Sequence, residues 1–360
     1  MTSLTRRHLI AGAAAAATLP SAPAIAQESR RWRLVTSWPK DAPGPGTTAR
    51  RLAESITALS GGRLTVELHA AGELVPAFEV FAAVEGGTAE MGHSASFFWA
   101  GKLPAAPFFT AVPFGLIPEM HNAWLEFGGG QALWDELYGA QGVKPFAAGN
   151  SGMQMGGWYN KEIKSLDDIT GLKVRMPGLG GEVLRRLGGT AVSIPPGEIY
   201  QALASGVVDG AELLGPWSDE AMGLPEAARY YYWPGFHEPN GSAECLVNLE
   251  AYESLPEDLR ALIAQACAAE NLRGQAEADW RNAETLLRMR AEGRVALRRF
   301  PEEVLRAARA AAAEVLAELA ESSEIAGRIH RSYRAAQDAA LAWGEVSRHA
   351  ILDAQLSEET

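Results

Sequence analysis

The 360-residue sequence predicts an α/β protein with two similar lobes and a ligand cleft between them. Three observations lead to this prediction: a strand–helix–strand pattern near the N-terminus, a segment that repeats later in the chain, and one unusually long helical pattern. Strands joined by helices form open, largely parallel sheets, and such sheets bind ligands outside the carboxyl ends of their strands.

The strand–helix–strand pattern covers residues 32–69. Residues 32–38 alternate apolar and polar side chains as a strand does, and residues 64–69 alternate again. Between them, Thr47 or Thr48 is suited to cap a helix whose apolar residues fall on one face over 52–59. This order is typical of a parallel α/β unit.

The repeat relates residues 79–90 to residues 198–209, a constant displacement of 119 positions. Glutamate, aromatic, alanine, aliphatic, glycine and acidic residues follow in the same order, which predicts a helix ended by glycine and then a strand. A chance match of common residues is the alternative to two similar lobes. If the lobes are similar, the loops after residues 92 and 211 should line the cleft.

Long helical patterns occupy the last third of the chain. Apolar faces that recur over such lengths pack on something, either the chain's own lobes or a partner subunit. The expected division of the chain is an export signal at 1–26, a first lobe at 27–150 with about 240–265, a second lobe at 151–239 with about 275–320, a long connecting helix at 256–292, and a C-terminal helix at 324–355 that is a candidate for dimerisation.

The export signal rests on Arg6 and Arg7, an apolar run, and small residues that end at Ala26. Paired arginines before Leu9 and Ile10 favour the twin-arginine route, and a general secretory signal is the alternative. Removing residues 1–26 changes the net charge from −12 to −14, because two arginines and no acids are lost. This acidity argues against nucleic acid and anionic membranes as partners.

Motifs of nucleophilic, zinc or nucleotide chemistry are absent from the sequence, so an enzyme is unsupported. Gly178, Gly180 and Gly181 do not form a dinucleotide fingerprint, since Val183 stands where the third glycine belongs. The two cysteines, Cys245 and Cys267, leave a disulfide undecided.

An anion site is better supported by Arg175. Residues 172–176 alternate as a strand, and an arginine at its end can bind a carboxylate through two parallel hydrogen bonds. An edge strand with a solvated face is the alternative. Asn150 and Gln154 supply amides nearby, although turn residues that satisfy their own loop would look the same.

The chain resembles the solute-binding proteins of the tripartite ATP-independent periplasmic (TRAP) transporters. Within that family it is most similar to the subgroup that binds 2-oxo acids and related monocarboxylates. The similarity extends from about Trp32 to Arg260. It is carried by the segments Ala71 to Ala77, Gly87 to His93, Val112 to Gly115, Gln154 to Trp158, Lys173 to Gly181, and His237 to Pro239.

The resemblance implies a periplasmic binding protein, not an enzyme, that delivers a small organic-acid anion to TRAP membrane subunits and forms a homodimer through its C-terminal helix. It implies that Arg175 grips the substrate carboxylate. It also implies a cation held by Gln154, Glu212 and the main-chain carbonyl of Leu213. The residues expected at the substrate are Arg175, Gln154, Asn150, Phe97, Phe98, Leu213 and Trp217.

Charge counting makes a cation reasonable, because Glu212 and a substrate carboxylate contribute −2 while Arg175 contributes +1. Na⁺ would bring this sum to zero, and Ca²⁺ would leave +1 but prefers such oxygen ligands, so both ions stay open.

The chain departs from the subgroup at Leu213, where tryptophan is usual, and at Phe97 and Phe98, where tyrosine is common. These departures suggest a ligand with a more apolar tail than pyruvate's methyl group. A ligand sensor for a signalling receptor and an exported hydrolase or lyase are the rival functions.

Overall fold

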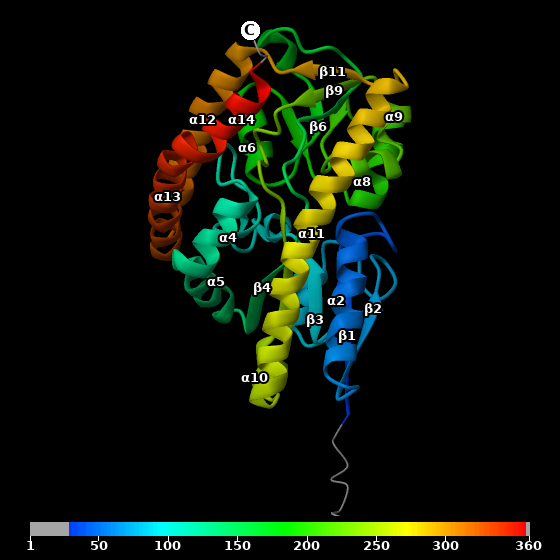
Figure 1. The fold of residues 1–360 in the computed structure, drawn as a ribbon, viewed down its shortest axis with the longest axis vertical. Helices are drawn as coiled ribbons and strands as arrows, with labels where there is room; N and C mark the ends of the chain where they lie inside the picture. Colours follow the sequence, from blue (N-terminus) through cyan, green and yellow to red (C-terminus); the bar gives the residue numbers. More distant parts are fainter. Residues whose placement is uncertain (1–28, 358–360) are drawn as a thin grey trace, which may run out of the picture.

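Two mixed β-sheets form the two lobes of the chain (Figure 1). The computed structural model describes residues 29–357. The first sheet has the order β2-β1-β3-β10-β4 and the second β11-β9-β5-β8-β6-β7. The strands are β1 (Arg30–Thr36), β2 (Leu64–His69), β3 (Met91–Ser94), β4 (Val143–Asn150), β5 (Gly157–Tyr159), β6 (Lys173–Arg175), β7 (Thr190–Val192), β8 (Gly210–Ala211), β9 (Tyr230–Trp233), β10 (Ser242–Asn248) and β11 (Ala296–Arg299).

Helices cover both sheets and connect them. They are α2 (Pro45–Leu59), α3 (Val80–Glu85), α4 (Pro118–Phe127), α5 (Gly130–Gly139), α6 (Gly178–Arg186), α7 (Ile199–Ala204), α8 (Pro216–Ala221), α9 (Leu224–Ala227), α10 (Leu249–Glu253), α11 (Glu257–Ala291), α12 (Glu302–Glu321), α13 (Glu324–Gly344) and α14 (Ala350–Leu356). The long helix α11 packs against α2 and β4 in the first lobe and against α8 in the second, as Figure 1 shows. The predicted fold class is therefore confirmed. The exact residue boundaries of the lobes stay a prediction.

The two lobes share the connectivity that the repeat predicts. Helix α3 begins at Val80 and α7 at Ile199, and the strands that follow begin at Met91 and Gly210, each pair 119 residues apart. In each sheet a strand that arrives from the other part of the chain pairs antiparallel with this strand, β10 with β3 and β5 with β8. The strand ends after the repeats consequently point into the space between the lobes.

Two local expectations are wrong. Helix α2 begins at Pro45, and the hydroxyls of Thr47 and Thr48 donate to the carbonyl of Gly44 inside the first turn instead of capping the helix. The glycines at 178, 180 and 181 predict a tight turn before a helix that begins at Glu182, but helix α6 already begins at Gly178, so these glycines lie in its first turn. A Cβ on Gly181 would lie 2.4 Å from the carbonyl oxygen of Met176, which explains why this turn needs glycine.

Strand β6 lies between β8 and β7, which excludes the edge-strand interpretation of Arg175. The predicted export signal falls outside the described residues. Among those residues, no helix has the length and apolar character needed to cross a membrane. Cys245 and Cys267 are buried and free, and a hydrogen bond to the Cys267 thiol together with burial raises the pKa of Cys245.

Candidate functional site

A cavity of about 60 Å³ lies between the lobes. This is several times the roughly 10–15 Å³ that one water occupies by the same measure, so a small organic molecule is a suitable occupant. Both lobes contribute to its wall. The residues up to 150 supply Trp38, Phe97, Phe98, Thr110 and Asn150, and the residues from 154 onward supply Gln154, Arg175, Leu213, Ser218 and Glu238.

Arg175 lies at the carboxyl end of β6, with a side chain that is almost fully buried at 2% exposure. Its Nη1 donates to the main-chain oxygen of Glu212 at 2.7 Å and to Oε1 of the same residue at 2.5 Å. Its Nε donates to the carbonyl of Ile194 at 3.2 Å. Within residues 29–357 no partner is found for Nη2. A positively charged donor that faces a cavity with one free end is suited to bind a carboxylate.

Two buried acids lie beside this arginine. Oε2 of Glu212 is 3.1 Å from Nε2 of His237, and the potential ligand atoms of Glu212, His237 and Glu238 all lie within 4.8 Å of one another. Burial and the negative charge of Glu212 raise the pKa of Glu238 well above its usual range. One guanidinium thus lies beside two carboxyl groups, of which Glu212 is its ion-pair partner.

The side-chain amides of Asn150 and Gln154 differ in whether their oxygen atoms already have a hydrogen-bond partner. Asn150 donates to Oδ1 of Asn240 at 2.8 Å and accepts from the main-chain nitrogen of Gly152 at 2.9 Å, so its own loop already uses both ends. Gln154 donates to Oγ of Ser151 at 2.9 Å, but its buried Oε1 has no donor among the described residues.

The main-chain carbonyl of Leu213 likewise accepts no hydrogen bond within the described part of the chain. Unpaired buried oxygens are costly unless something positive binds them. The oxygens of Gln154, Glu212 and Leu213 therefore fit a hard cation, which takes carboxylate and carbonyl ligands.

Aromatic and aliphatic side chains form the opposite wall. Phe97, Phe98 and Leu213 line the cavity together with Trp38. Trp38 is held by His93, whose Nδ1 accepts from the indole Nε1 at 2.8 Å and whose Nε2 lies 3.1 Å from the carbonyl of Ala148. Burial lowers the pKa of His93 to about 4, which keeps the ring neutral at pH 7 so that it can accept this bond.

Trp217 was expected at the substrate, but the structure does not place it among the residues that line the cavity. It belongs to the first turn of α8, where its main-chain nitrogen donates to Oδ1 of Asn282 on α11 at 3.0 Å. It lines a separate depression with Glu277 and Arg281 instead of the cavity. Within α8, Trp217 thus lies beside α11, whereas its neighbour Ser218 lines the cavity.

Sequence reasoning also missed a supporting residue, Asp219. This buried carboxylate accepts hydrogen bonds from Nε1 of Trp158 at 3.0 Å, the hydroxyl of Tyr231 at 2.8 Å and the main-chain nitrogen of Leu214 at 3.1 Å. The carbonyl of Leu214 in turn accepts from Met155 at 3.0 Å. The segments that carry Glu212, Leu213 and Gln154 are thereby fastened together, and no sequence motif signals this role.

The sequence model of the bacterial extracellular solute-binding proteins, family 7, matches residues 34–323. The chain belongs to this family. The family 7 chain is 41% identical over 320 residues to the monocarboxylate 2-oxoacid-binding periplasmic protein all3028 of Nostoc, a match that covers 88% of this chain and 86% of the relative.

Solved structures similar to this family 7 protein are TRAP solute-binding proteins. One from Bordetella bronchiseptica, a mixed-occupancy dimer with calcium and picolinate, is 38% identical with a TM-score of 0.88 and covers 91% of this chain and 97% of that one. One from Colwellia psychrerythraea, with calcium and pyruvate, is 37% identical with a TM-score of 0.88 over 90% and 99%. One from Pseudoalteromonas atlantica, with sodium and pyruvate, is 36% identical with a TM-score of 0.88 over 92% and 100%. The resemblance to TRAP solute-binding proteins is confirmed.

Proposed function

We propose that this family 7 protein is a periplasmic solute-binding protein that captures a small 2-oxo or 2-hydroxy monocarboxylate with a cation and delivers it to TRAP membrane subunits. The observation that carries the proposal is the free end of Arg175 in a buried cavity, beside two acids and two unpaired carbonyl oxygens. Relatives that bind pyruvate with calcium or sodium support it. Binding, and not turnover, is the proposed activity.

Each group has a role in this function. Arg175 binds the ligand carboxylate, and Gln154, Glu212 and the Leu213 carbonyl hold the cation. When bound, the cation supplies positive charge that attracts the ligand's carboxylate and 2-oxo or 2-hydroxy oxygens. Oγ of Ser218 on α8 donates to the carbonyl of Pro43 at 3.0 Å, a contact between the lobes that favours closure over the ligand.

The tail of the ligand should be more apolar than pyruvate's methyl group, because Phe97, Phe98 and Leu213 make that wall apolar. In a thermal-shift and calorimetric series, 2-oxo acids with three to five carbons beyond the carboxylate should raise the melting temperature more than pyruvate does. Matched amides, which lack the charge, serve as controls and should have no effect. Strongest stabilisation by pyruvate would contradict the tail assignment, and no response to any acid would contradict the proposed function.

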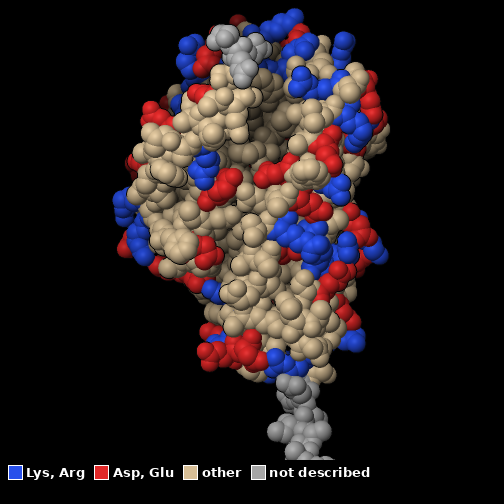
Figure 2. Space-filling view, viewed as in Figure 1, with Lys and Arg blue, Asp and Glu red and all other residues tan. Residues whose placement is uncertain are grey.

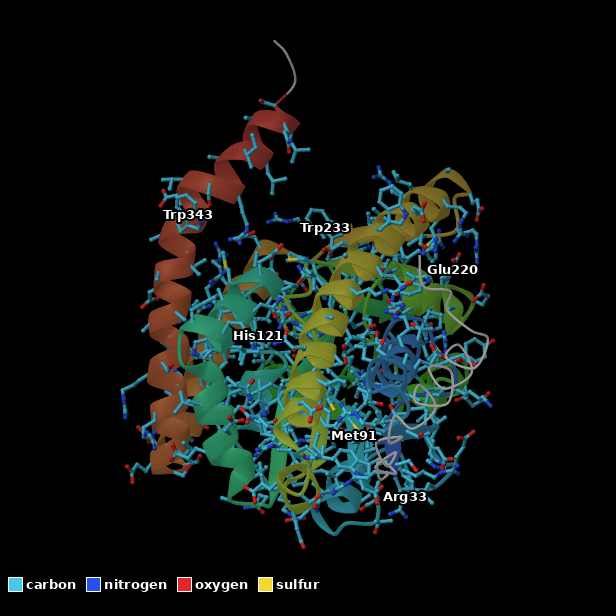
Figure 3. All side chains as sticks on the ribbon, turned by 60° about the horizontal axis from the view of Figure 1, so that its bottom comes forward. Arg33, Met91, His121, Glu220, Trp233 and Trp343 are labelled. Atoms are coloured by element: carbon cyan, nitrogen blue, oxygen red, sulfur yellow. The ribbon has the colours of Figure 1, made fainter. Side chains whose placement is uncertain are left out.

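We further propose a homodimer. Helix α13 packs on its own chain: the hydroxyl of Tyr333 accepts a hydrogen bond from the main-chain nitrogen of Leu116 at 2.7 Å, and Nε2 of Gln337 donates to the carbonyl of Phe114 at 2.7 Å. Beyond it, a π turn at Glu345–His349 leads into α14, which extends past the rest of the chain near Trp343 (Figure 3). The end of α13, the π turn and α14 together expose large apolar side chains: Leu341, Trp343, Val346, Ile351, Leu352 and Leu356.

The surface is hollowed beside these helices (Figure 2), and a groove of about 690 Å³ there is lined by residues of α12, α13 and the segment around Phe236. An exposed apolar helix end next to a groove is typical of an interface between subunits. The dimeric Bordetella relative supports this.

Truncation after Gly344 should leave the fold intact and convert the dimer to a monomer, because it removes the exposed end and keeps α13 in place. Light scattering of both chains at the same concentration measures the change. A monomeric full-length protein would contradict the dimer, as would a truncated protein that is still dimeric.

A further inference from the structure

Asn240 has no role in the site described above, although its side chain joins two distant parts of the chain. It lies on the segment 234–241, which leads from β9 to β10, and it is 1% exposed. Its Oδ1 accepts a hydrogen bond from Nδ2 of Asn150 at 2.8 Å, and its Nδ2 donates to the main-chain oxygen of Thr110 at 2.8 Å. Both ends of this buried amide therefore bind segments that are far away in the sequence.

The bond to Asn150 holds the two connecting segments of the lobes together. From Asn150, at the end of β4, the chain continues through residues 151–156 to β5, while residues 234–241 return from β9 to β10. Beside the amide pair, the main-chain nitrogen of Ser151 donates to the carbonyl of Gly241 at 3.0 Å. A Cβ on Gly241 would collide with Oγ of Ser151, so this close approach needs glycine. The two segments are thereby fastened where they leave the first lobe.

The bond to Thr110 continues to the aromatic side of the cavity. Oγ1 of Thr110 accepts hydrogen bonds from the main-chain nitrogen of Ser96 at 2.9 Å and from Oγ of Ser96 at 2.7 Å. Ser96 begins a short 3₁₀ turn that carries Phe97 and Phe98, the two rings that line the cavity. One residue, Thr110, thus separates Asn240 from the turn that forms this wall.

We propose that Asn240 is a positioning residue that sets where the wall of Phe97 and Phe98 lies relative to the connecting segments, and thereby which ligand tail the cavity accepts. Asn240 itself is not among the residues that line the cavity. The inference rests on the proposed function for the presence of an organic acid in the cavity. It adds a residue outside the cavity that determines selectivity within it.

Burial gives these hydrogen bonds their influence. Asn150, Asn240 and Thr110 are each at most 6% exposed, so water does not take the place of a lost partner. A buried polar group left unpaired costs more than the bond itself contributes, and its neighbours shift to satisfy it. Hinge segments change their backbone dihedrals when lobes part. The bonds through Asn240 and Thr110 keep the wall fixed to the first-lobe ends of these segments throughout that motion.

Two substitutions interrupt the connection at different places. Asn240→Ala removes both bonds of the amide, although the main-chain nitrogen of Ser242 still donates to the carbonyl of Thr110 at 3.3 Å. Thr110→Val removes only the hydroxyl that holds Ser96. Each variant should weaken binding of a 2-oxo acid with a longer apolar tail by roughly tenfold and binding of pyruvate by roughly threefold or less, because the tail and not the carboxylate contacts the wall.

Matched controls and a conservative variant separate positioning from general damage. Asn160→Ala and Thr190→Val replace exposed residues and should keep the affinity ratio of the unmodified protein. Thr110→Ser retains the hydroxyl and should restore the preference that Thr110→Val loses. Calorimetry with pyruvate and the longer acid measures each ratio. An unchanged ratio in both Asn240→Ala and Thr110→Val would overturn the inference.

Hydrogen exchange of the ligand-free, full mature chain gives a second readout that does not depend on any acid. In Asn240→Ala and Thr110→Val, the amides of residues 96–98 should exchange faster, while those of β1 and β2 should exchange as in the unmodified protein. A general loss of stability would accelerate exchange in all these segments alike. Uniform acceleration, or unchanged exchange at 96–98, would therefore overturn the inference.

The two proposals fail differently. If the unmodified protein binds no acid, the proposed function fails and the claim on tail selectivity fails with it, while exchange at 96–98 still decides whether Asn240 positions the wall. If Asn240→Ala does not fold, as judged by circular dichroism, Thr110→Val decides alone, because it leaves both asparagines in place.

Discussion

Arg175→Ala is expected to abolish measurable binding of monocarboxylates. The guanidinium is the positively charged donor that faces the cavity, and removing one partner of a buried, hydrogen-bonded charge pair costs about 2–5 kcal/mol of binding free energy. Calorimetry with pyruvate and a longer 2-oxo acid measures the loss. Arg185→Ala, an exposed arginine of α6, is the control and should leave the affinity unchanged.

Loss of binding must be separated from loss of the fold, because Arg175 also neutralises Glu212. Removing it alone leaves the buried carboxylate of Glu212 without its ion-pair partner and should lower the free energy of unfolding by about 3–5 kcal/mol. The double variant Arg175→Met with Glu212→Gln removes both charges of the pair and should recover most of that stability while still failing to bind. Wild-type affinity in Arg175→Ala would reject the assignment of the carboxylate site.

Removal of the cation should weaken acid binding, and Glu212→Ala should remove both the cation dependence and most of the affinity. In the present arrangement Oε1 of Glu212 occupies Nη1 of Arg175 at 2.5 Å, so Glu212 competes with an incoming carboxylate. A cation that takes over Glu212 leaves the guanidinium free to bind the ligand through both terminal nitrogens. Coupling between two sites is typically about 1–3 kcal/mol, so the expected change is roughly 5–150-fold.

Titrations of the acid with a chelator in sodium-free buffer, and again with each ion added, measure this coupling. Linkage requires that the acid tighten ion binding by the same factor, which provides an internal check. Glu253→Ala is the control and should keep the full cation dependence. Cation-dependent binding that persists in Glu212→Ala would show that this carboxylate is not a ligand.

The parts of the site that the sequence could predict are those set by local pattern. Alternation placed Arg175 at a strand end, and the repeat aligned the loops after β3 and β8. The ligand roles of Gln154, Glu212 and Leu213 came from the family resemblance and stay predictions.

What the sequence could not predict depends on contacts between distant segments. Glu238 meets Glu212 because the chain folds back from β9 to β10, and no periodicity encodes that approach. The position of Trp217 could not be predicted, because α8 begins directly after Gly215 and places this residue beside Glu277 and Arg281 of α11. Similarly, α13 and α14 have similar composition, and only packing against Phe114 and Leu116 distinguishes the half that covers its own lobe.

The contact between Ser218 and Pro43 has a consequence for timing. Arg175, Gln154 and Glu238 are each at most 6% exposed, so a ligand bound among them has no way out while the lobes stay together. The lifetime of the complex is then the waiting time for the lobes to part, and not the time needed to break the bonds to the acid. A membrane subunit that pulls the lobes apart would therefore control when the cargo is released, however tightly the cleft holds it.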